Sequence, residues 1–238
     1  MSSHSRLLVV AINALLIHLK STPPNPPAHK VERVKFDGKN TRKEFLACFL
    51  LWSRPVYQII NIFLAVCEIH VLLRPPFLSP LGRILPSCSP DAIQRLGIST
   101  IFILGSILIM CGSSFRLWAF RKLGPFFTFE QSFKDDHKLV TDGPYAVVRH
   151  PGYIGAAMAC SGAILNHVGS GSYWRECGVW KSHFIGPLGG FWILENLLLG
   201  IAVVGRVPCE DVAMQKQFKN DWEVWARSTP YKLIPFVY

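Results

Sequence analysis

The sequence predicts an all-α, polytopic integral membrane protein with about five transmembrane helices and a C-terminal cytoplasmic amphipathic helix. The chain has 238 residues, of which 50% are hydrophobic and only 17% are charged, and its mean hydropathy is +0.29. A soluble domain usually carries about a quarter charged residues. The apolar residues also gather into runs that approach the roughly 20 residues needed to cross a bilayer.

Five apolar segments are the candidate spans. Two of them are irregular: the first is short, and the second contains Arg54-Pro55, so it is either one helix kinked by the proline or a short interfacial helix followed by a span from Val56. The first is also open to interpretation as a signal segment, although no clear small-x-small cleavage site follows it. The five are Leu7–Leu19, Phe45–Leu73, Leu96–Phe115, Pro151–Val168 and Phe184–Gly205.

The number of basic residues alternates between high and low from one loop to the next. Seven Lys/Arg fall in residues 20–43, three in 74–95, six in 116–149, two in 170–183 and five from residue 206 onward. The positive-inside rule then places the first, third and last of these segments in the cytoplasm. Cleavage of the first apolar segment would leave the most basic loop on the far side, so we interpret that segment as a span.

The net charge of +10 has two interpretations. Nucleic-acid binding is the first one that such a charge suggests. Here, however, the basic residues lie in loops between apolar runs and not along one stripe, which is typical of membrane proteins. We therefore expect the bilayer, and no nucleic acid, as a partner.

The seven cysteines are scattered and include no C-x-x-C pair. An odd, scattered set argues against a zinc site or a disulfide framework. In the predicted topology only Cys88 and Cys177 share the lumenal side, and a bridge between them stays open. No Gly-x-Gly-x-x-Gly pattern follows a strand, which excludes the soluble dinucleotide-binding type of nucleotide site.

The segment LVTDGPYAVVRHPGYIG, residues 139–155, places Arg149-His150-Pro151 at the start of an apolar run. Proline suits the first turn of a helix, and the amides of a helix start suit an anion such as a cofactor carboxylate. Taken alone, the Arg-His pair is also explained as an interfacial anchor.

A second pattern lies near the C-terminus. Arg206 ends the fifth apolar run, Val207-Pro208 fits a new helix start, and Glu210 falls in its first turn, where acids are favoured. Met214, Phe218, Trp222 and Trp225 then recur at helical spacing, before Tyr231-Lys-Leu-Ile-Pro235. Taken alone, without the first motif, this pattern is explained by structure and does not require a function.

Together, these two patterns resemble the isoprenylcysteine carboxyl methyltransferase family, over roughly the C-terminal half. The resemblance implies a region of N-terminal spans (1–118) and a methyltransferase core (119–238) that uses S-adenosyl-L-methionine. Its acceptor would be the C-terminal carboxylate of a prenylated cysteine in CAAX-type proteins, in the endoplasmic reticulum membrane. The alternatives are a membrane phospholipid or other lipid N-methyltransferase, and a catalytically silent protein of the same fold.

The resemblance also implies the site. Arg206 would contact the substrate carboxylate, as a guanidinium can do bidentately. Glu130 stands where the family has a glutamine or similar residue. No metal is expected. The residues expected to enclose the cofactor are Glu130, His137, Lys138, Leu139, Val140, Tyr145, His150, Pro151, Gly152, Tyr153 and Glu210.

Overall fold

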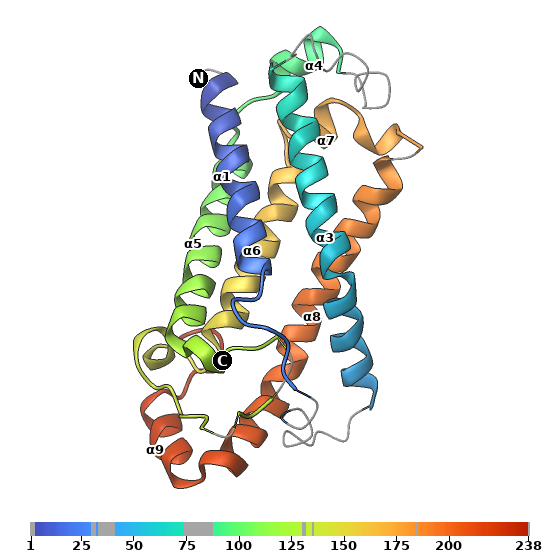
Figure 1. Ribbon diagram of the computed structural model, residues 1–238. Helices are drawn as coiled ribbons and strands as arrows, with labels where there is room; N and C mark the ends of the chain where they lie inside the picture. The colour runs from blue at the N-terminus through green and yellow to red at the C-terminus, as the bar shows by residue number, and fades with distance from the viewer. Residues whose placement is uncertain are drawn as a thin grey trace.

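The computed structural model describes residues 3–29, 32, 41–73, 88–129, 132–134, 136–183 and 185–237. These residues form a bundle of long helices with shorter ones at its two ends and, in the described ranges, no strand (Figure 1). The long helices are α1 (Ser3–Ser21), α3 (Thr41–Leu73), α5 (Thr100–Leu123), α6 (Pro151–Val168) and α8 (Ile185–Phe218). The short ones are α4 (Pro90–Arg95), α7 (Tyr173–Glu176) and α9 (Asn220–Ser228).

Three stretches of the described chain are long and apolar enough to cross a membrane: Ser53–Leu73, Thr100–Phe126 and Ile185–Phe218. The predicted all-α membrane class is confirmed. By length and composition, three of the described helices qualify as spans, against the predicted number of about five. The helices α1 and α6 are not among them. Their side chains Asn13 and Asn166 donate to Ser106 Oγ of α5, at 2.9 and 3.0 Å. These two helices therefore direct polar side chains into the bundle, although Asn13 Oδ1 and Asn166 Oδ1 are buried without a partner among the described residues.

Several predicted boundaries change. Pro55 lies within one continuous α3, which selects the single-helix alternative, and α6 has the predicted bounds. The prediction of a new helix at Val207-Pro208 is wrong, because α8 continues through Pro208 to Phe218. A proline inside a helix removes one backbone hydrogen bond, and the 34-residue helix retains the others.

The predicted aromatic stripe from Met214 to Trp225 is also divided. Lys219 has a φ of 49° and ends the long helix, so Trp222 and Trp225 belong to the separate helix α9. The left-handed backbone at Lys219 turns the chain sharply. This turn brings Trp225 back toward the start of α6, where the site lies.

The helices α5 and α6 approach closely through paired glycines. A Cβ atom built on Gly112 would lie 2.7 Å from the Gly155 carbonyl oxygen, and one on Gly155 would lie 2.6 Å from that of Gly112. Any larger side chain would collide with backbone at these positions. Small residues permit this kind of contact in lipid. The pairing fixes α6 against α5, and thereby fixes the RHP motif at its start.

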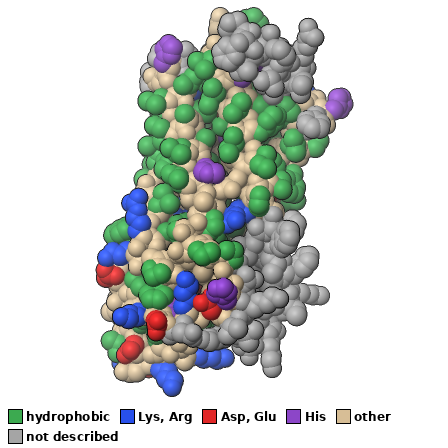
Figure 2. All heavy atoms as spheres, viewed as in Figure 1, with side chains coloured by type: hydrophobic (Ala, Val, Ile, Leu, Met, Phe, Trp, Pro, Cys, Tyr) green, Lys and Arg blue, Asp and Glu red, His purple; other side chains and the backbone are tan. Residues whose placement is uncertain are grey.

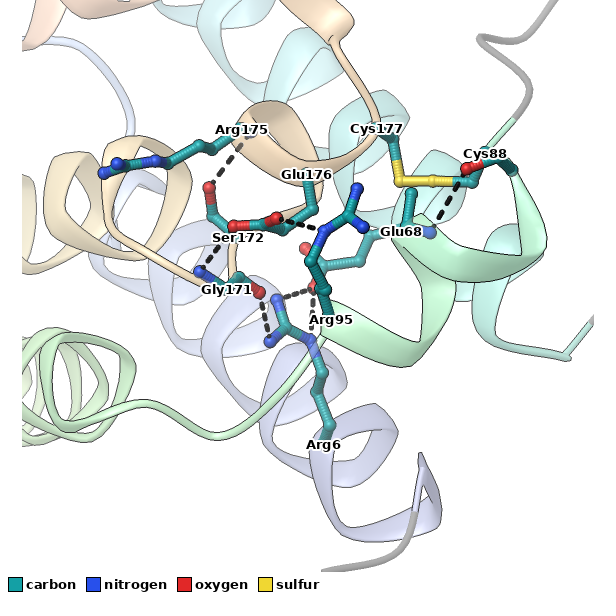
Figure 3. Close-up of a disulfide and its surroundings, with 11 residues drawn as sticks. Arg6, Glu68, Cys88, Arg95, Gly171, Ser172, Arg175, Glu176 and Cys177 are labelled. Carbon is teal, nitrogen blue, oxygen red and sulfur yellow. Dashed lines mark hydrogen bonds and ion pairs between the residues drawn. A yellow bond between two sulfur atoms is a disulfide. The ribbon is translucent and has the colours of Figure 1, made fainter.

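The end of the bundle that carries the N-terminus is held by a disulfide and a buried ion pair (Figure 3). Cys88 and Cys177, 89 positions apart, form the bridge. Arg6 Nη2 lies 2.6 Å from Glu68 Oε1, and Arg6 also donates to the Gly97 and Gly171 carbonyls. The bridge that the sequence left open is therefore present in the structure.

The loops with both predicted motifs lie at the opposite end, around α9 (Figure 1). Figure 2 shows that hydrophobic side chains predominate on the upper part of the visible face, whereas Lys, Arg, Asp and Glu gather at this lower end. The structure thus brings the RHP motif and the C-terminal motif to one polar end of the bundle.

Candidate active site

A cavity of about 200 Å³ opens at this polar end. Its wall combines residues from α1, α3, α5, α6, α8 and α9 with residues of the loop that precedes α6. Nine residues predicted for the site line it: His137, Lys138, Val140, Tyr145, His150, Gly152, Tyr153, Arg206 and Glu210.

Two other predicted residues, Leu139 and Pro151, do not line the cavity. Leu139 packs against a small hydrophobic cluster that includes Tyr145 and Trp225. Pro151 is buried at the start of α6. Both residues lie next to residues that line the cavity without lining it themselves. Glu130 lies outside the residues that the structure describes, so its predicted role stays a prediction.

Asp211 joins the two motifs. Its Oδ1 lies 2.9 Å from His150 Nε2, and its Oδ2 lies 3.1 Å from Arg149 Nη2 and 3.7 Å from Lys232 Nζ. By position alone, next to Glu210, it is an acid of the kind expected near a helix start. Asp211 is in fact buried, and three basic groups surround it.

The C-terminal segment closes over the RHP motif through its backbone. The Arg149 N–H donates to the Tyr231 carbonyl and the His150 N–H to the Lys232 carbonyl, both at 2.9 Å. The Tyr153 and Ile154 amides donate to the His150 carbonyl. The helix start therefore uses part of its donor capacity within the chain, and its role as an anchor for a cofactor anion stays a prediction.

Glu210 lies beside this cluster with its side chain 30% exposed. The Tyr153 hydroxyl donates to Glu210 Oε2 at 2.6 Å, and His150 Nδ1 lies 3.7 Å from the same oxygen. The rings of His150 and Tyr153 stack with 5.6 Å between centroids. Glu210 is thus held by one strong hydrogen bond while its carboxylate remains at the cavity wall.

Arg206 lies one helical turn before Glu210 on α8. Its Nη2 donates to the Phe129 carbonyl at 3.1 Å, and its guanidinium lies 6.0 Å from the centroid of the Tyr153 ring. Its Nε is buried and, among the described residues, has no hydrogen-bond partner. A guanidinium has five donors, so Arg206 keeps donors for an anionic ligand.

An aromatic group surrounds His137. The rings of Phe126, Phe133 and Phe218 have centroids 4.8, 5.5 and 5.8 Å from that of His137. Burial lowers the pKa of His137 below its usual value, so the neutral imidazole is favoured. Burial also raises the pKa of the Tyr145 hydroxyl. His137 Nδ1 is buried without a partner in the described chain, as a ligand-facing atom would be.

Sequence reasoning missed the charged residues that the N-terminal helices contribute. Lys20, Arg54 and Arg116 line the cavity together with Glu195 of α8. Arg116 Nε donates to the Lys20 carbonyl at 3.0 Å and its Nη1 to the Gly152 carbonyl. A charge within or next to an apolar helix signals function by itself, and this signal was available in the sequence.

These residues fit S-adenosyl-L-methionine by their chemistry. The aromatic group around His137 provides ring faces, and His137 Nδ1 is an unpartnered buried atom. The carboxylate of Glu210 suits a cationic or hydroxyl group. No cluster of three or more metal-ligating side chains occurs among the residues that were described.

Two comparisons with known proteins were informative to different degrees. No curated protein matches the chain. The family model described as phospholipid methyltransferase matches residues 100–174, from the start of α5 into α7, including the RHP motif but not Arg206 or Glu210. That family includes the isoprenylcysteine carboxyl methyltransferases. The match covers less than half of the chain and supports the resemblance to this family of membrane methyltransferases over residues 100–174.

Proposed function

We propose that this protein is an S-adenosyl-L-methionine-dependent protein-S-isoprenylcysteine O-methyltransferase, which esterifies the C-terminal carboxylate of a prenylated cysteine. One observation carries the proposal: Arg206, whose buried Nε has no hydrogen-bond partner among the described residues, stands at the cavity wall one turn from Glu210. The Glu210 carboxylate would face the cofactor, and a cation next to it suits an anionic acceptor.

In this proposal the two residues divide the work. Arg206 holds the acceptor carboxylate by charge-assisted hydrogen bonds. Glu210, fixed by the Tyr153 hydroxyl, and the neutral His137 hold the cofactor. When bound, S-adenosyl-L-methionine supplies an electrophilic methyl group on its sulfonium sulfur.

The chain's own contribution to the reaction is alignment. Held by Arg206, the acceptor would already be a carboxylate, so no residue of the chain would have to remove a proton from it. The site therefore needs no strong general base, and holding the two partners in line provides much of the rate. If Arg206 bound the acceptor carboxylate too tightly, the carboxylate would be a weaker nucleophile. The Phe129 carbonyl already accepts a hydrogen bond from Arg206 Nη2 and so moderates the strength of that binding.

The proposal also assigns an orientation. Disulfides form in oxidising compartments such as the lumen of the endoplasmic reticulum, and the Cys88–Cys177 bridge lies at the end opposite the cavity. Basic loops favour the cytoplasmic side. Both arguments support a cavity that faces the cytoplasm from the endoplasmic reticulum membrane, where prenylated proteins present their C-termini.

A second candidate is a phospholipid N-methyltransferase, which the description of the matched family favours. A lipid amine is protonated at neutral pH and would have to lose a proton before it attacked. The positive charge of Arg206 would repel the lipid ammonium and so weaken binding of the form that dominates at neutral pH. We therefore place this activity second.

One experiment separates the candidates. Membranes that contain the protein are incubated with methyl-labelled S-adenosyl-L-methionine and N-acetyl-S-farnesylcysteine, with Arg206→Ala membranes as the control. Base-labile label on the farnesylcysteine supports the proposal, and label in phospholipid supports the second candidate. If folded protein labels neither acceptor, both proposals are contradicted and a catalytically silent protein is indicated.

A further inference from the structure

A short proline-rich segment, Thr22–Ala28, follows α1 at the cavity end of the bundle and is the blue trace below that helix in Figure 1. Its sequence, TPPNPPA, contains four prolines. Each proline fixes its own φ near −65° and has no N–H to donate, and it keeps the residue before it extended. This segment, called the proline strap below, is therefore stiff, and its backbone has few donors to offer.

Asn25, in the middle of the proline strap, bonds to a distant part of the chain. Its Nδ2 donates to the Gly124 carbonyl at 2.7 Å and to the Phe127 carbonyl at 2.9 Å. Carbonyl oxygens only accept, so the amide nitrogen, and not the amide oxygen, must face them. One side-chain amide thus connects the segment after α1 to the segment after α5.

The two carbonyls belong to the turn that ends α5. This turn is η3 (Gly124–Phe126), in which Gly124 has a φ of 54°, and the Phe127 N–H donates back to the Gly124 carbonyl at 3.3 Å. Asn25 therefore holds the first residue of the turn and the residue directly after it. The turn cannot open without breaking both side-chain hydrogen bonds.

The turn carries part of the aromatic wall of the cavity. Phe126 and Phe127 both line the cavity. The Phe126 ring lies 4.8 Å from that of His137, with 27° between the ring planes. The Phe127 ring lies 4.0 Å from that of Phe120 and 5.5 Å from that of Phe129. A fixed turn therefore fixes the Phe126 ring relative to His137.

The chain just beyond the proline strap supports the other side of the same wall. Ala28, the last residue of the strap, is buried. The His29 N–H donates to Glu32 Oε2 at 2.9 Å, and the Phe133 N–H donates to the Glu32 carbonyl at 3.2 Å. Phe133 lines the cavity, and its ring lies 5.5 Å from that of His137. The N-terminal segment thus bonds the backbone next to two of the three phenylalanines around that histidine.

We propose that Asn25 is a positioning residue for the cofactor, which fixes the Phe126 and His137 rings at the spacing at which they enclose the adenosyl group. The proposal rests on the proposed function, because that function assigns the aromatic group to S-adenosyl-L-methionine. Asn25 does not itself line the cavity, so it acts through the turn. A wall that is ordered before the cofactor arrives binds it more tightly, because no ordering cost remains to be met.

The first test measures cofactor binding directly. Full-length wild type and variants in lipid nanodiscs are titrated with S-adenosyl-L-methionine. Asn25→Ala removes two hydrogen bonds and should raise the Kd about fivefold or more. Asn25→Asp keeps the size of the side chain but turns an acceptor toward two carbonyls, so its Kd should rise at least as much. Asn220→Ala, the same exchange at an exposed position of α9, is the control and should leave the Kd unchanged.

A second measurement separates positioning from stability. In assays with N-acetyl-S-farnesylcysteine, Asn25→Ala should raise the KM for S-adenosyl-L-methionine and leave the KM for the acceptor and kcat close to those of the wild type. A purely structural role would instead reduce the fraction of active protein. The apparent kcat would then fall while neither KM changed, and that result overturns the proposal.

The remaining outcomes are also decisive. A wild-type Kd in Asn25→Ala or in Asn25→Asp overturns the positioning role and leaves the proposed function intact. If neither variant folds, hydrogen exchange of the cofactor-free wild type decides. The Phe127 amide should already exchange slowly, and rapid exchange that slows only with S-adenosyl-L-methionine overturns the proposal.

Failure of the proposed function looks different. Wild type that binds S-adenosyl-L-methionine but does not methylate the acceptor contradicts the proposed function, and the Kd values of the variants still decide the role of Asn25. Folded wild type that binds no S-adenosyl-L-methionine contradicts both proposals.

Discussion

His150 Nε2 and Asp211 Oδ1 lie 2.9 Å apart although the two residues are separated by 61 positions in the chain. The contact joins the start of α6 to the C-terminal part of α8, and Arg149 reinforces it from the same loop. The RHP motif and the C-terminal motif, which are far apart in the sequence, therefore form one physical unit. Changes at either residue should affect both sides of the cavity.

Asp211→Asn should destabilise the protein strongly. The substitution keeps the shape of the side chain but leaves Arg149, and any charge on His150, buried without a counter-charge. Removing one partner of a buried ion pair costs about 3 kcal/mol. Thermal unfolding in nanodiscs measures the loss, with Asp221→Asn on the exposed face of α9 as the matched control. An unchanged melting temperature for Asp211→Asn would contradict the structural role of the cluster.

Arg206→Ala should abolish methylation and leave cofactor binding unchanged. In our assignment Arg206 contacts only the acceptor, whereas Glu210 and His137 hold the cofactor. Equilibrium binding of S-adenosyl-L-methionine and the methylation rate are measured on the same purified variant. Loss of cofactor binding in a folded variant would place Arg206 on the cofactor side. Arg206→Lys, which keeps the charge but not the planar fork, should retain partial activity.

Tyr153→Phe should weaken cofactor binding about fivefold. The hydroxyl of Tyr153 donates to Glu210 at 2.6 Å, and a hydrogen bond of this kind contributes about 1 kcal/mol. The ring, and its stacking on His150, stay in place, so stability should change little. Isothermal titration of S-adenosyl-L-methionine gives the affinity. An unaltered affinity together with a lower melting temperature would mean that this contact is only structural.

The stability of the protein should depend on the protonation of His137. Burial lowers the pKa of His137 in the folded state, with a further lowering from Lys134 that Glu210 opposes, so the unfolded chain binds the proton more readily. The free energy of unfolding therefore rises with pH from the lowered pKa up to the ordinary value of about 6.5. It falls as the solution is acidified through that window.

His137→Phe keeps the ring contacts and removes this titration. Its melting temperature should change less than that of the wild type when the pH is lowered from about 7 to about 5. The exposed His183→Gln variant serves as the control and should follow the wild type. A wild-type-like pH profile for His137→Phe would show that other groups dominate the dependence.

Cys177→Ser should lower the melting temperature by removing the cross-link between Cys88 and Cys177. The bridge closes a loop of 89 positions, and a disulfide typically stabilises by about 2–4 kcal/mol. Cys111→Ser, at an exposed free cysteine, is the control. Thiol labelling of endoplasmic reticulum membranes under native conditions provides a direct check. Full labelling of both cysteines without a reductant would contradict the bridge and the orientation that depends on it.

The sequence predicted those features that depend on local pattern. Pro151 marks the start of α6 and the polar residues after Val168 mark its end, because a proline and a change of polarity act over a few residues. The helix boundary at Pro208 was predicted wrongly, since a proline favours a helix start but does not prevent a helix from continuing. The break after Phe218 follows from the left-handed backbone at Lys219, which composition does not reveal.

The part of the site that the sequence missed comes from contacts over long distances in the chain. Asp211 has the appearance of an ordinary helix acid until the fold places it against Arg149 and His150. Lys20 and Glu195 lie 175 positions apart (195 − 20), and no local spacing connects them. Their presence in apolar helices was the available signal, and only the fold shows which cavity they share.

The interlocked glycines of α5 and α6 determine which parts of the molecule are able to move. With Gly112 and Gly155 in backbone contact, these two helices have no room to slide or separate, and they behave as one rigid wall. A lipid tail that passes from the bilayer into the cavity must therefore displace something else. Among the described residues, the contacts of α8 with α3 and α6 have no such seam, so under the proposed function a lateral path for the acceptor would open along α8.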